Sequence, residues 1–357
     1  MPFDPSKNRR QLFSDGFNQL LNQVAEATDI KKPLAFLGLD RSYTTMTREA
    51  MWTDFQILFG SYENSDAKRV ASACLNEVNR QDGLLNIWQG DTELMRINRE
   101  AHQHPVPVSD DLFDFIATAK RLYDQTGGAF DVSSTPLVRC WGFFTRNPRI
   151  PTQREIDEAR AHVGMEHVQL DEEKRTVFFT REGLELTPAS MGKGFAIDRA
   201  VAIARERGLQ DVLLNGGFSS VYASGAPAWK DHWQIDVRNP LGSEKPLARL
   251  RLCNQGFSSS GSEDQKILAD GHLFSHIIDP RTGWPAEEML NINVVAPTAT
   301  EAEALSTAFF VLGVEKTLEY CENHSEIGVV MLAAAQQPGG HPRVITANLD
   351  PSQVEVV

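Results

Sequence analysis

Two segments of the chain place polar side chains where they can bind a phosphate group and a metal ion. Residues 186–198 form a glycine-containing turn that runs into a predicted helix, and Lys193 lies at the start of that helix. A helix N-terminus offers free N–H groups and the positive end of the helix dipole, which suit phosphate. Further along the chain, Glu303 and Thr307 are four residues apart and share one face of another predicted helix. Two oxygen ligands at that spacing suit a hard cation such as Mg²⁺.

Both segments also have a purely structural interpretation. The first does not match the phosphate-binding sequence G-x-x-x-x-G-K-[ST], and it equally predicts a closely packed helix start with Asp198 on the surface. In the second, Thr300 and Glu303 have the spacing of a capping box, in which the Glu303 side chain would satisfy a backbone N–H group at the helix start. The capping box accounts for Glu303 but leaves Thr307 unexplained.

A third polar segment follows the serine-rich sequence at residues 258–261. Residues 276–283 bring together His276, Asp279 and Arg281. His276 is a candidate general base, and the Arg281 guanidinium can pair with a phosphate or clamp a carboxylate. The same stretch is also a plain turn sequence, in which Asp279 caps its own turn.

Aromatic side chains flank a fourth polar segment, residues 128–137. Phe130 lies within this segment and Trp141 follows it closely. Aromatic rings beside a polar loop can stack on a flat ligand ring. Alternatively, Phe130 and Trp141 belong to the core and Asp131 caps a helix. The sequence leaves both interpretations open.

The elements that must hold these segments are helices mixed with short strands. Hydrophobic periodicity predicts helices over 67–90, 110–125, 151–163, 192–208 and 301–312. It predicts strands over 55–59, 168–170, 176–180, 212–214, 221–224, 233–237, 248–252, 292–295 and 329–332. Several strands follow one another at hairpin spacing, which favours an α+β fold of mixed, largely antiparallel sheets packed with helices. We assign residues 1–45 to an N-terminal helical extension and residues 46–357 to the main domain, with 329–332 as its last strand.

The composition is typical of a globular protein and argues against binding to nucleic acids. The chain has 35 Lys and Arg against 48 Asp and Glu, and its formal net charge of −13 repels phosphate backbones. No apolar run approaches the about 18 residues that suggest a membrane span. Residues 8–13 superficially match a twin-arginine export sequence, but polar residues follow where such a sequence needs an apolar stretch. We therefore expect an amphipathic helix there and a cytoplasmic protein, with an extracytoplasmic location as the alternative.

Taken together and in order, these segments resemble the ApbE family, the FAD:protein FMN transferases, over roughly residues 45 to 335. The family's Gly-Ala-Phe-Asp loop with a later Trp-Gly-Phe is similar to Gly128–Asp131 and Trp141–Phe143. Its His-Ile-Leu-Asp-Pro-Arg-Thr-Gly sequence is nearly intact at His276–Gly283. Four further motifs also have counterparts: Met51–Thr53, Lys193–Gly194 with Asp198, Ser259–Gly261 for the family's Thr-Ser-Gly, and Ala302–Ala308.

The resemblance implies an ApbE-like, T-fold-like body that binds FAD in a cleft, holds Mg²⁺, transfers FMN to a Thr or Ser hydroxyl of an acceptor protein, and releases AMP. The implied metal ligands are the backbone carbonyl of Ser190 and the side chains of Glu303 and Thr307, with Ser306 adjacent. His276 is implied as the base for the incoming hydroxyl, with Asp279 and Arg281 shaping its surroundings. The family's flavin contacts map to Met51, Asn98, Ala129, Phe130, Asp131, Lys193 and Ser260.

Four departures from the family's motifs bear on activity. Thr187 and Ser219 each stand where the family has an acidic residue. Glu303 replaces a shorter aspartate, which shifts an oxygen that Mg²⁺ would need in near-octahedral geometry. Trp52 replaces a glycine and either crowds the cleft or stacks on a ring. Two alternatives to the transferase therefore remain on the same fold, a FAD pyrophosphatase that yields FMN and AMP, and a non-catalytic FAD-binding protein.

Overall fold

The computed structural model describes most of the chain after its N-terminal segment. The described residues are 43–60, 65–88, 90–143, 149–227, 230–261, 266–269, 272–335 and 341–357. They belong to the unit Ser42–Val357. The predicted amphipathic helix and the twin-arginine-like sequence lie outside the described residues.

An eight-stranded sheet forms the centre of this unit, and its neighbouring strands pair antiparallel throughout. Its strand order is β1-β2-β6-β7-β10-β13-β14-β15. The bounds are β1 Tyr43–Ala50, β2 Thr53–Gly60, β6 Val212–Gly216, β7 Ser220–Ser224, β10 Gln255–Gly261, β13 Met289–Ala296, β14 Gly328–Ala333 and β15 Arg343–Ala347. The sheet confirms the predicted α+β class with largely antiparallel strands.

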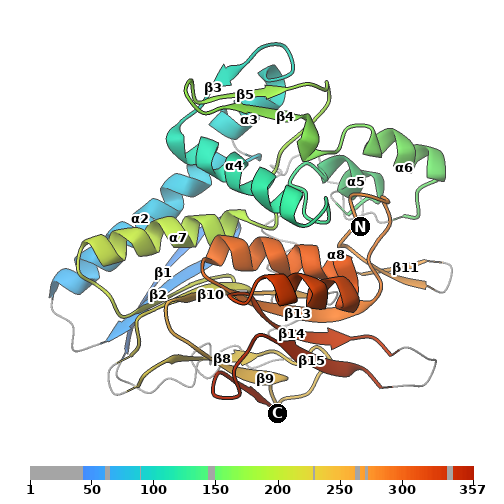
Figure 1. Cartoon of the computed structure of the whole chain (residues 1–357). Helices are drawn as coiled ribbons and strands as arrows, with labels where there is room; N and C mark the ends of the chain where they lie inside the picture. Colours follow the sequence, from blue (N-terminus) through green and yellow to red (C-terminus); the bar gives the residue numbers. More distant parts are fainter. Residues whose placement is uncertain are drawn as a thin grey trace, which may run out of the picture. The chain divides into compact units, whose positions relative to one another are not determined.

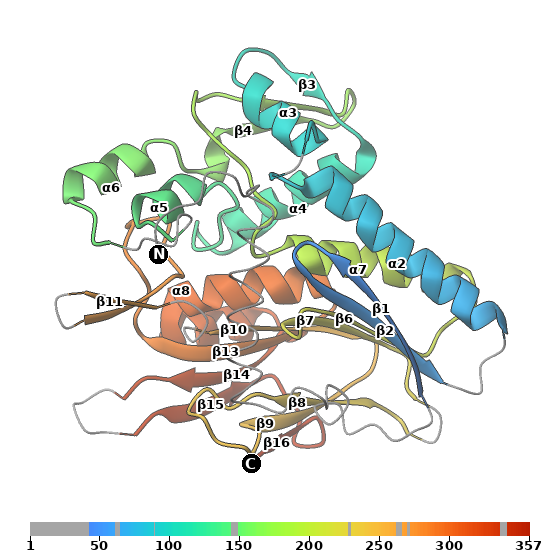
Figure 2. The same ribbon diagram turned by 180° about the vertical axis from the view of Figure 1, so that it is seen from behind.

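Helices cover one side of this sheet, as Figures 1 and 2 show. The covering helices are α2 (Ser65–Leu85), α7 (Gly192–Glu206) and α8 (Ala299–Asn323), with α4 (Asp110–Gln125) lying over α7 and α8. Helix α8 is interrupted at Gly313, whose backbone has φ 78°, so the break falls directly after the predicted helix end at residue 312. On the other side of the large sheet, as Figure 2 shows, lies a three-stranded sheet of β8 (Trp233–Val237), β9 (Ala248–Leu252) and β16 (Val354–Val356).

Smaller elements complete the unit beyond α4 and at its edge. A second three-stranded sheet has the order β3-β5-β4, and a two-stranded hairpin joins β11 and β12. The bounds are α3 Glu93–Glu100, β3 Val106–Pro107, α5 Thr135–Cys140, α6 Gln153–Arg160, β4 Val168–Asp171, β5 Thr176–Phe179, β11 Lys266–Ala269 and β12 His272–Ser275, with a 3₁₀ turn at Met165–His167.

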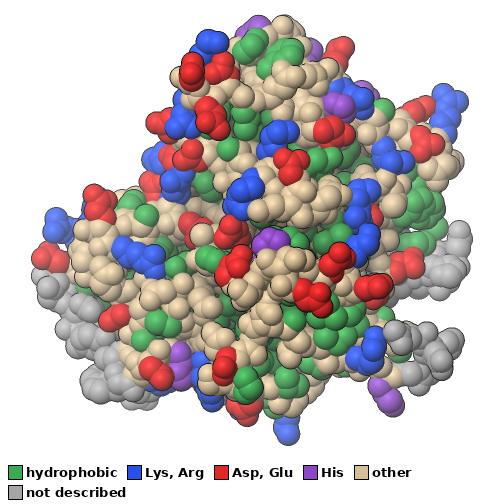
Figure 3. All heavy atoms as spheres, in the orientation of Figure 1, with side chains coloured by type: hydrophobic (Ala, Val, Ile, Leu, Met, Phe, Trp, Pro, Cys, Tyr) green, Lys and Arg blue, Asp and Glu red, His purple; other side chains and the backbone are tan. Residues whose placement is uncertain are grey.

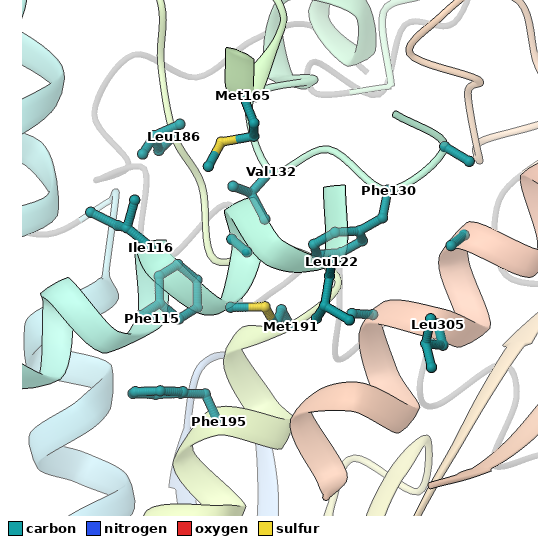
Figure 4. Close-up of a cluster of buried hydrophobic side chains, with 14 of the residues drawn as sticks. Phe115, Ile116, Leu122, Phe130, Val132, Met165, Leu186, Met191, Phe195 and Leu305 are labelled. Carbon is teal, nitrogen blue, oxygen red and sulfur yellow. The ribbon is translucent and has the colours of Figure 1, made fainter. Parts of the chain in front are cut away.

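A shared hydrophobic core fixes α4, α7 and α8 relative to one another. Figure 4 shows Leu122 of α4, Phe130 of the loop after it, Met191 at the start of α7 and Leu305 of α8 in one cluster. Each of these side chains is at most 1% exposed. Close packing of this kind resists displacement, so the starts of α7 and α8 are held in a defined position.

Three differences from the predicted elements have physical explanations. Strands β15 and β16 follow the strand predicted to be the last; both are short and none of their residues is buried, so the buried-core pattern used for the prediction is absent there. Strand β1 begins at Tyr43, within the segment assigned to the extension, and its mostly polar sequence gave no periodic pattern. Helix α2 ends at Leu85 and not at residue 90, and Asn86 then accepts a hydrogen bond from the Trp88 backbone through its side chain.

On the face drawn in Figure 3, charged side chains do not gather into patches of one sign. Acidic and basic side chains lie interspersed there, so the net charge of −13 is not gathered into one field on that face. Over the residues described, no helix combines the length and the apolar composition that crossing a bilayer requires.

The turn between β1 and β2 places two large residues in a backbone conformation that favours glycine. Ala50 pairs with Thr53, so Met51 and Trp52 form a two-residue turn, and their φ angles are 47° and 63°. Both angles are positive, as in the type I′ turns that commonly close hairpins. Trp52 is 44% exposed, so its packing compensates only partly for the left-handed backbone.

We expect the Trp52→Gly variant to be more stable than the Trp52→Ala variant by about 0.5–1 kcal/mol. Both changes remove the same indole contacts, and only alanine keeps the steric cost of positive φ. Denaturant unfolding measures the difference. Glu49, an exposed residue of β1, is the control, because alanine should be the more stable replacement there. Equal stability of the two Trp52 variants would contradict the assigned turn.

Candidate active site

Three segments that the family resemblance singles out lie at one end of the large sheet. Phe55 of β2 pairs with Gly216 of β6, and Ser220 of β7 pairs with Ser258 of β10. The turn after β6 is tied to β2 through the Gly217 backbone, whose N–H donates to the Asp54 carbonyl at 3.0 Å. The Met51–Trp52 turn, the turn between β6 and β7, and the end of β10 with Ser260 therefore lie along the same edge.

Helices α7 and α8 begin in direct contact beside this edge. A Cβ on Gly194 would lie 2.3 Å from the carbonyl oxygen of Ala299, so only glycine permits the approach. The Asp198 carboxylate accepts the backbone N–H groups of Ala299 and Thr300, each at 2.9 Å, and the hydroxyl of Thr300. Burial raises the pKa of Asp198 to about 6, although these hydrogen bonds lower it. The interpretation of Asp198 as a surface residue is therefore wrong, because its carboxylate caps α8.

Glu303 makes the corresponding contact in the opposite direction. Helix α7 has Met191 at its N-cap, which makes no side-chain hydrogen bond there. Instead, the Glu303 carboxylate accepts the Gly194 backbone N–H at 2.6 Å and forms an ion pair with Lys193. The Glu303 side chain is 5% exposed and that of Lys193 is 28% exposed. A carboxylate thus occupies the helix N-terminus at which the sequence predicts a phosphate.

The predicted capping box at the start of α8 is wrong. The N-cap residue is Thr298, whose side chain accepts the Glu301 backbone N–H at 3.1 Å and donates to the Glu301 carboxylate. The N-cap residue therefore lies two residues earlier than predicted. Glu303 does not cap the start of its own helix, and its carboxylate instead contacts α7.

Hydroxyl groups from β10 and α8 form a cluster beside Glu303. The hydroxyls of Ser260 and Ser306 lie 2.8 Å apart, and Ser306 also donates to the Glu303 carbonyl at 2.9 Å. Thr307, one residue further on, contacts the same carbonyl at 3.5 Å. The buried Ser220 hydroxyl, opposite Ser258 in the sheet, has no partner among the described residues. The structure thus brings Lys193, Glu303, Ser306, Thr307 and Ser260 together, as the resemblance implies.

This cluster fits Mg²⁺ in the kind of atom it offers but not in its arrangement. Its donors are all oxygens, which Mg²⁺ prefers. However, the carboxylate of this cluster belongs to Glu303, and both of its oxygens already accept hydrogen bonds. One binds the Lys193 ammonium and the other binds the Gly194 backbone N–H. Within the described residues, no group of three or more His, Cys, Asp and Glu could hold a metal ion. In this arrangement Glu303 serves as the partner of Lys193 and not as a metal ligand.

Three further candidates, Ser190, Asn98 and Met51, lie close to α7. Ser190, implied to supply its carbonyl, has a φ of 69° in the loop that leads into the helix. Asn98 of α3 clamps the chain just before this loop, because its amide accepts the Leu186 N–H at 2.9 Å and donates to the Leu186 carbonyl at 2.8 Å. Met51 packs against both hydrophobic clusters that flank α7. The polar atoms of Asn98 are therefore engaged in positioning the loop.

The catalytic candidates His276, Asp279 and Arg281 occupy one loop after β12. Arg281 donates to both carboxylate oxygens of Asp279 at 2.9 Å, which raises the pKa of the guanidinium. The Asp279 carbonyl closes a turn by accepting the Gly283 N–H at 2.8 Å, so the predicted turn is present as well. The His276 ring meets the Phe143 ring edge-on, with 6.4 Å between centroids.

This loop packs against residues 128–143 and not, in the contacts described, against Lys193. A Cβ on Gly128 would lie 3.6 Å from Cγ of Arg281, and the Trp141 indole N–H donates to the Gly283 carbonyl at 2.8 Å. Phe130 and Trp141 are buried, so of the two interpretations the burial supports core residues. Ala129 is buried as well, which leaves its backbone as the part able to touch a ligand.

Asp131 is a buried carboxylate that forms a turn with Ser133. Its Oδ1 accepts the Ser133 backbone N–H at 2.7 Å and the Ser133 hydroxyl at 2.6 Å. Helix α5 begins later, with Ser134 at its N-cap, so Asp131 does not cap it. Burial raises the pKa of Asp131 to about 6, against the lowering effect of these hydrogen bonds.

The raised pKa of Asp131 predicts a pH-dependent stability. The folded protein holds the proton more tightly than the unfolded chain, so the contribution is complete below about pH 4 and is lost as the pH rises through about 6. The quantity to follow is the free energy of unfolding of the wild type minus that of the Asp131→Asn variant. This difference should therefore fall by about 1.4 kcal/mol between pH 5 and pH 7.5. Denaturant unfolding at the two pH values measures this difference.

The control is Asp171→Asn, because Lys174 lowers the pKa of the exposed Asp171 carboxyl and places its titration below pH 5. The difference between wild type and this variant should stay constant over the same pH range. A constant difference for Asp131→Asn as well would show that its carboxyl does not titrate in this range.

The family of the chain follows from its likeness to known proteins. The ApbE family model matches residues 51–331, which contain the α7–α8 junction and the His276 loop. The FAD:protein FMN transferase of Salmonella typhimurium is 33% identical over 263 residues, which cover 71% of this chain and 75% of that protein. This chain belongs to the ApbE family. The FAD:protein FMN transferase of Escherichia coli K12 is 31% identical over the same shares of the two chains.

Solved ApbE structures share the fold. The crystal structure of the ApbE protein of Thermotoga maritima superposes with a TM-score of 0.74 at 26% identity, covering 85% of this chain and 96% of that one. The apo flavinyl transferase ApbE of Pseudomonas stutzeri gives a TM-score of 0.74 at 24% identity, covering 87% and 96%. The recognition of the ApbE family from its ordered motifs is thus confirmed.

Proposed function

We propose that this ApbE-family protein transfers FMN from FAD to a Thr or Ser hydroxyl of an acceptor protein and releases AMP. One observation carries the proposal: Lys193 and the N-terminus of α7 lie beside the hydroxyl cluster of β10 and α8. The partly exposed Lys193 ammonium offers positive charge and hydrogen-bond donors to a diphosphate. The relatives named FAD:protein FMN transferase support the same activity.

The transfer needs one new bond and breaks one. The acceptor oxygen attacks the phosphorus of the FMN half of FAD, and the bond from that phosphorus to the bridging oxygen breaks. The proton of the hydroxyl passes to an imidazole nitrogen of His276, and AMP leaves with the bridging oxygen. Negative charge builds on the departing phosphate, where the Lys193 ammonium can stabilise it.

Magnesium dependence stays a prediction from the resemblance. A bound Mg²⁺ would neutralise the diphosphate and make its phosphorus easier to attack. The implied ligands are the Ser190 carbonyl, Glu303 and Thr307, with Ser306 adjacent, but Glu303 is bound to Lys193 in the arrangement described. Whether transfer requires the ion is tested by measuring turnover with EDTA and after addition of Mg²⁺.

Incubation of the full chain with FAD, Mg²⁺ and a threonine-containing acceptor peptide tests the proposal. The expected result is AMP release together with a gain of one FMN in peptide mass. AMP with free FMN and an unmodified peptide would instead identify a FAD pyrophosphatase. Retention of FAD without AMP would identify a flavin-binding protein that does not catalyse.

A further inference from the structure

Helices α7 and α8 cap each other reciprocally. Asp198, in the second turn of α7, accepts the first two backbone N–H groups of α8, and Glu303, in the second turn of α8, accepts a first-turn N–H of α7. A helix leaves its first N–H groups without partners in its own ladder, and carboxylates there also gain from the helix dipole. Each helix therefore supplies a carboxylate that accepts backbone N–H groups at the start of the other helix.

The contact leaves little freedom between the two helices. The start of α8 lies between α7 and β10, because a Cβ on Gly194 would meet Ala299 and a Cβ on Gly256 would meet the Thr298 carbonyl, each at 2.3 Å. The two caps are about one helical turn apart on each helix. Two attachment points at that separation fix the rotation of α8 against α7 as well as its distance.

The start of α8 has a second cap that does not involve α7. Thr298 satisfies the Glu301 N–H within the helix itself. The two capping residues therefore have different roles. Thr298 stabilises the helix start locally, and Asp198 joins α8 to α7. Removal of either cap weakens the start of α8, but removal of Asp198 alone loosens the contact that brings Glu303 to Lys193.

We propose that Asp198 is a positioning residue that sets the place of Glu303 against Lys193. The importance of this pair for catalysis rests on the proposed function, whereas its geometry does not. Lys193 can offer its charge to a diphosphate at one defined place only while α8 keeps Glu303 beside it. Asp198 contacts the start of α8, and its effect on Lys193 is transmitted by this helix, which carries Glu303.

Two readouts test the inference in the Asp198→Asn and Thr298→Ala variants. The first is the rate at which N-hydroxysuccinimidyl acetate acetylates Lys193, followed by mass spectrometry with Lys174 as the internal reference. The second is kcat and KM for FAD in the peptide assay. Thr298→Ala should lower Tm but leave both readouts within about twofold of wild type. Asp198→Asn should raise Lys193 labelling at least threefold and lower kcat at least tenfold, with a smaller change in KM.

A milder variant keeps the test valid if Asp198→Asn fails to fold. Thr300→Val removes one hydroxyl donor to Asp198 and leaves both backbone hydrogen bonds in place. It should shift Lys193 labelling in the same direction by a smaller factor.

The inference is overturned if Lys193 in Asp198→Asn and Thr300→Val is acetylated at the wild-type rate. It is also overturned if Lys193 in these variants is acetylated no faster than in Thr298→Ala when the loss of Tm is equal. If labelling changes as expected but the wild type transfers no FMN, the positioning role stands and the proposed function fails. If the wild type transfers FMN and labelling stays unchanged, only the positioning role fails.

Discussion

The Lys193→Met variant is expected to lose about 3 kcal/mol of unfolding free energy, because it leaves the Glu303 carboxylate buried without its cation. Methionine keeps most of the length of the lysine side chain and removes its charge. The same change should lower FMN transfer by about 10²–10³-fold, since a positioned donor to developing charge is lost. Denaturant unfolding and the peptide assay measure the two effects separately.

A second substitution separates the buried charge from other causes. Glu303→Gln keeps an oxygen that can accept the Gly194 N–H but carries no charge. The double variant Lys193→Met/Glu303→Gln should therefore be more stable than Lys193→Met alone, because the unpaired charge is gone. Additive losses of stability would show that the ion pair is not what holds this junction.

The His276→Ala variant is expected to lose about 10²–10⁴-fold in kcat while FAD still binds. This follows if His276 takes the proton of the incoming hydroxyl, since a general base acts on the reacting step and not on cofactor affinity. Equilibrium binding of FAD and the rate of AMP release give the two quantities.

His104→Ala is the matched control, because His104 is exposed after α3 and its ring meets only the Pro105 carbonyl in the described contacts. It should keep full activity. A His276→Ala variant that releases AMP and modifies the peptide at the wild-type rate would remove His276 from the mechanism.

Strong periodic patterns made most of the scaffold predictable. The helix predicted over 110–125 has those bounds in the structure, and the strands at 233–237 and 248–252 also match. Strand β10 was missed, although it lies centrally between β7 and β13. Its sequence is rich in Ser and Gly and has no β-branched residue, so it lacks the side chains that are enriched in strands. Gly256 is needed there because α8 passes so closely, and the serines supply hydroxyls to the cluster.

The site was predictable as a set of residues but not as a set of contacts. The spacing of Glu303 and Thr307 placed them on one helix face, and the ordered motifs pointed to Lys193 and Ser260. That Glu303 would pair with Lys193 and cap α7 depends on how two helices pack across more than 100 residues of chain. The surface interpretation of Asp198 fails for the same reason, because its hydrogen-bond partners lie on α8.

A crystal structure of the protein with FAD is the most direct test of the central claim. The account predicts that the diphosphate lies between the loop before Lys193 and the part of α8 that bears Thr307, within hydrogen-bond distance of Lys193 Nζ. A dinucleotide bound elsewhere, with the Lys193–Glu303 pair and its surroundings left untouched, would contradict it.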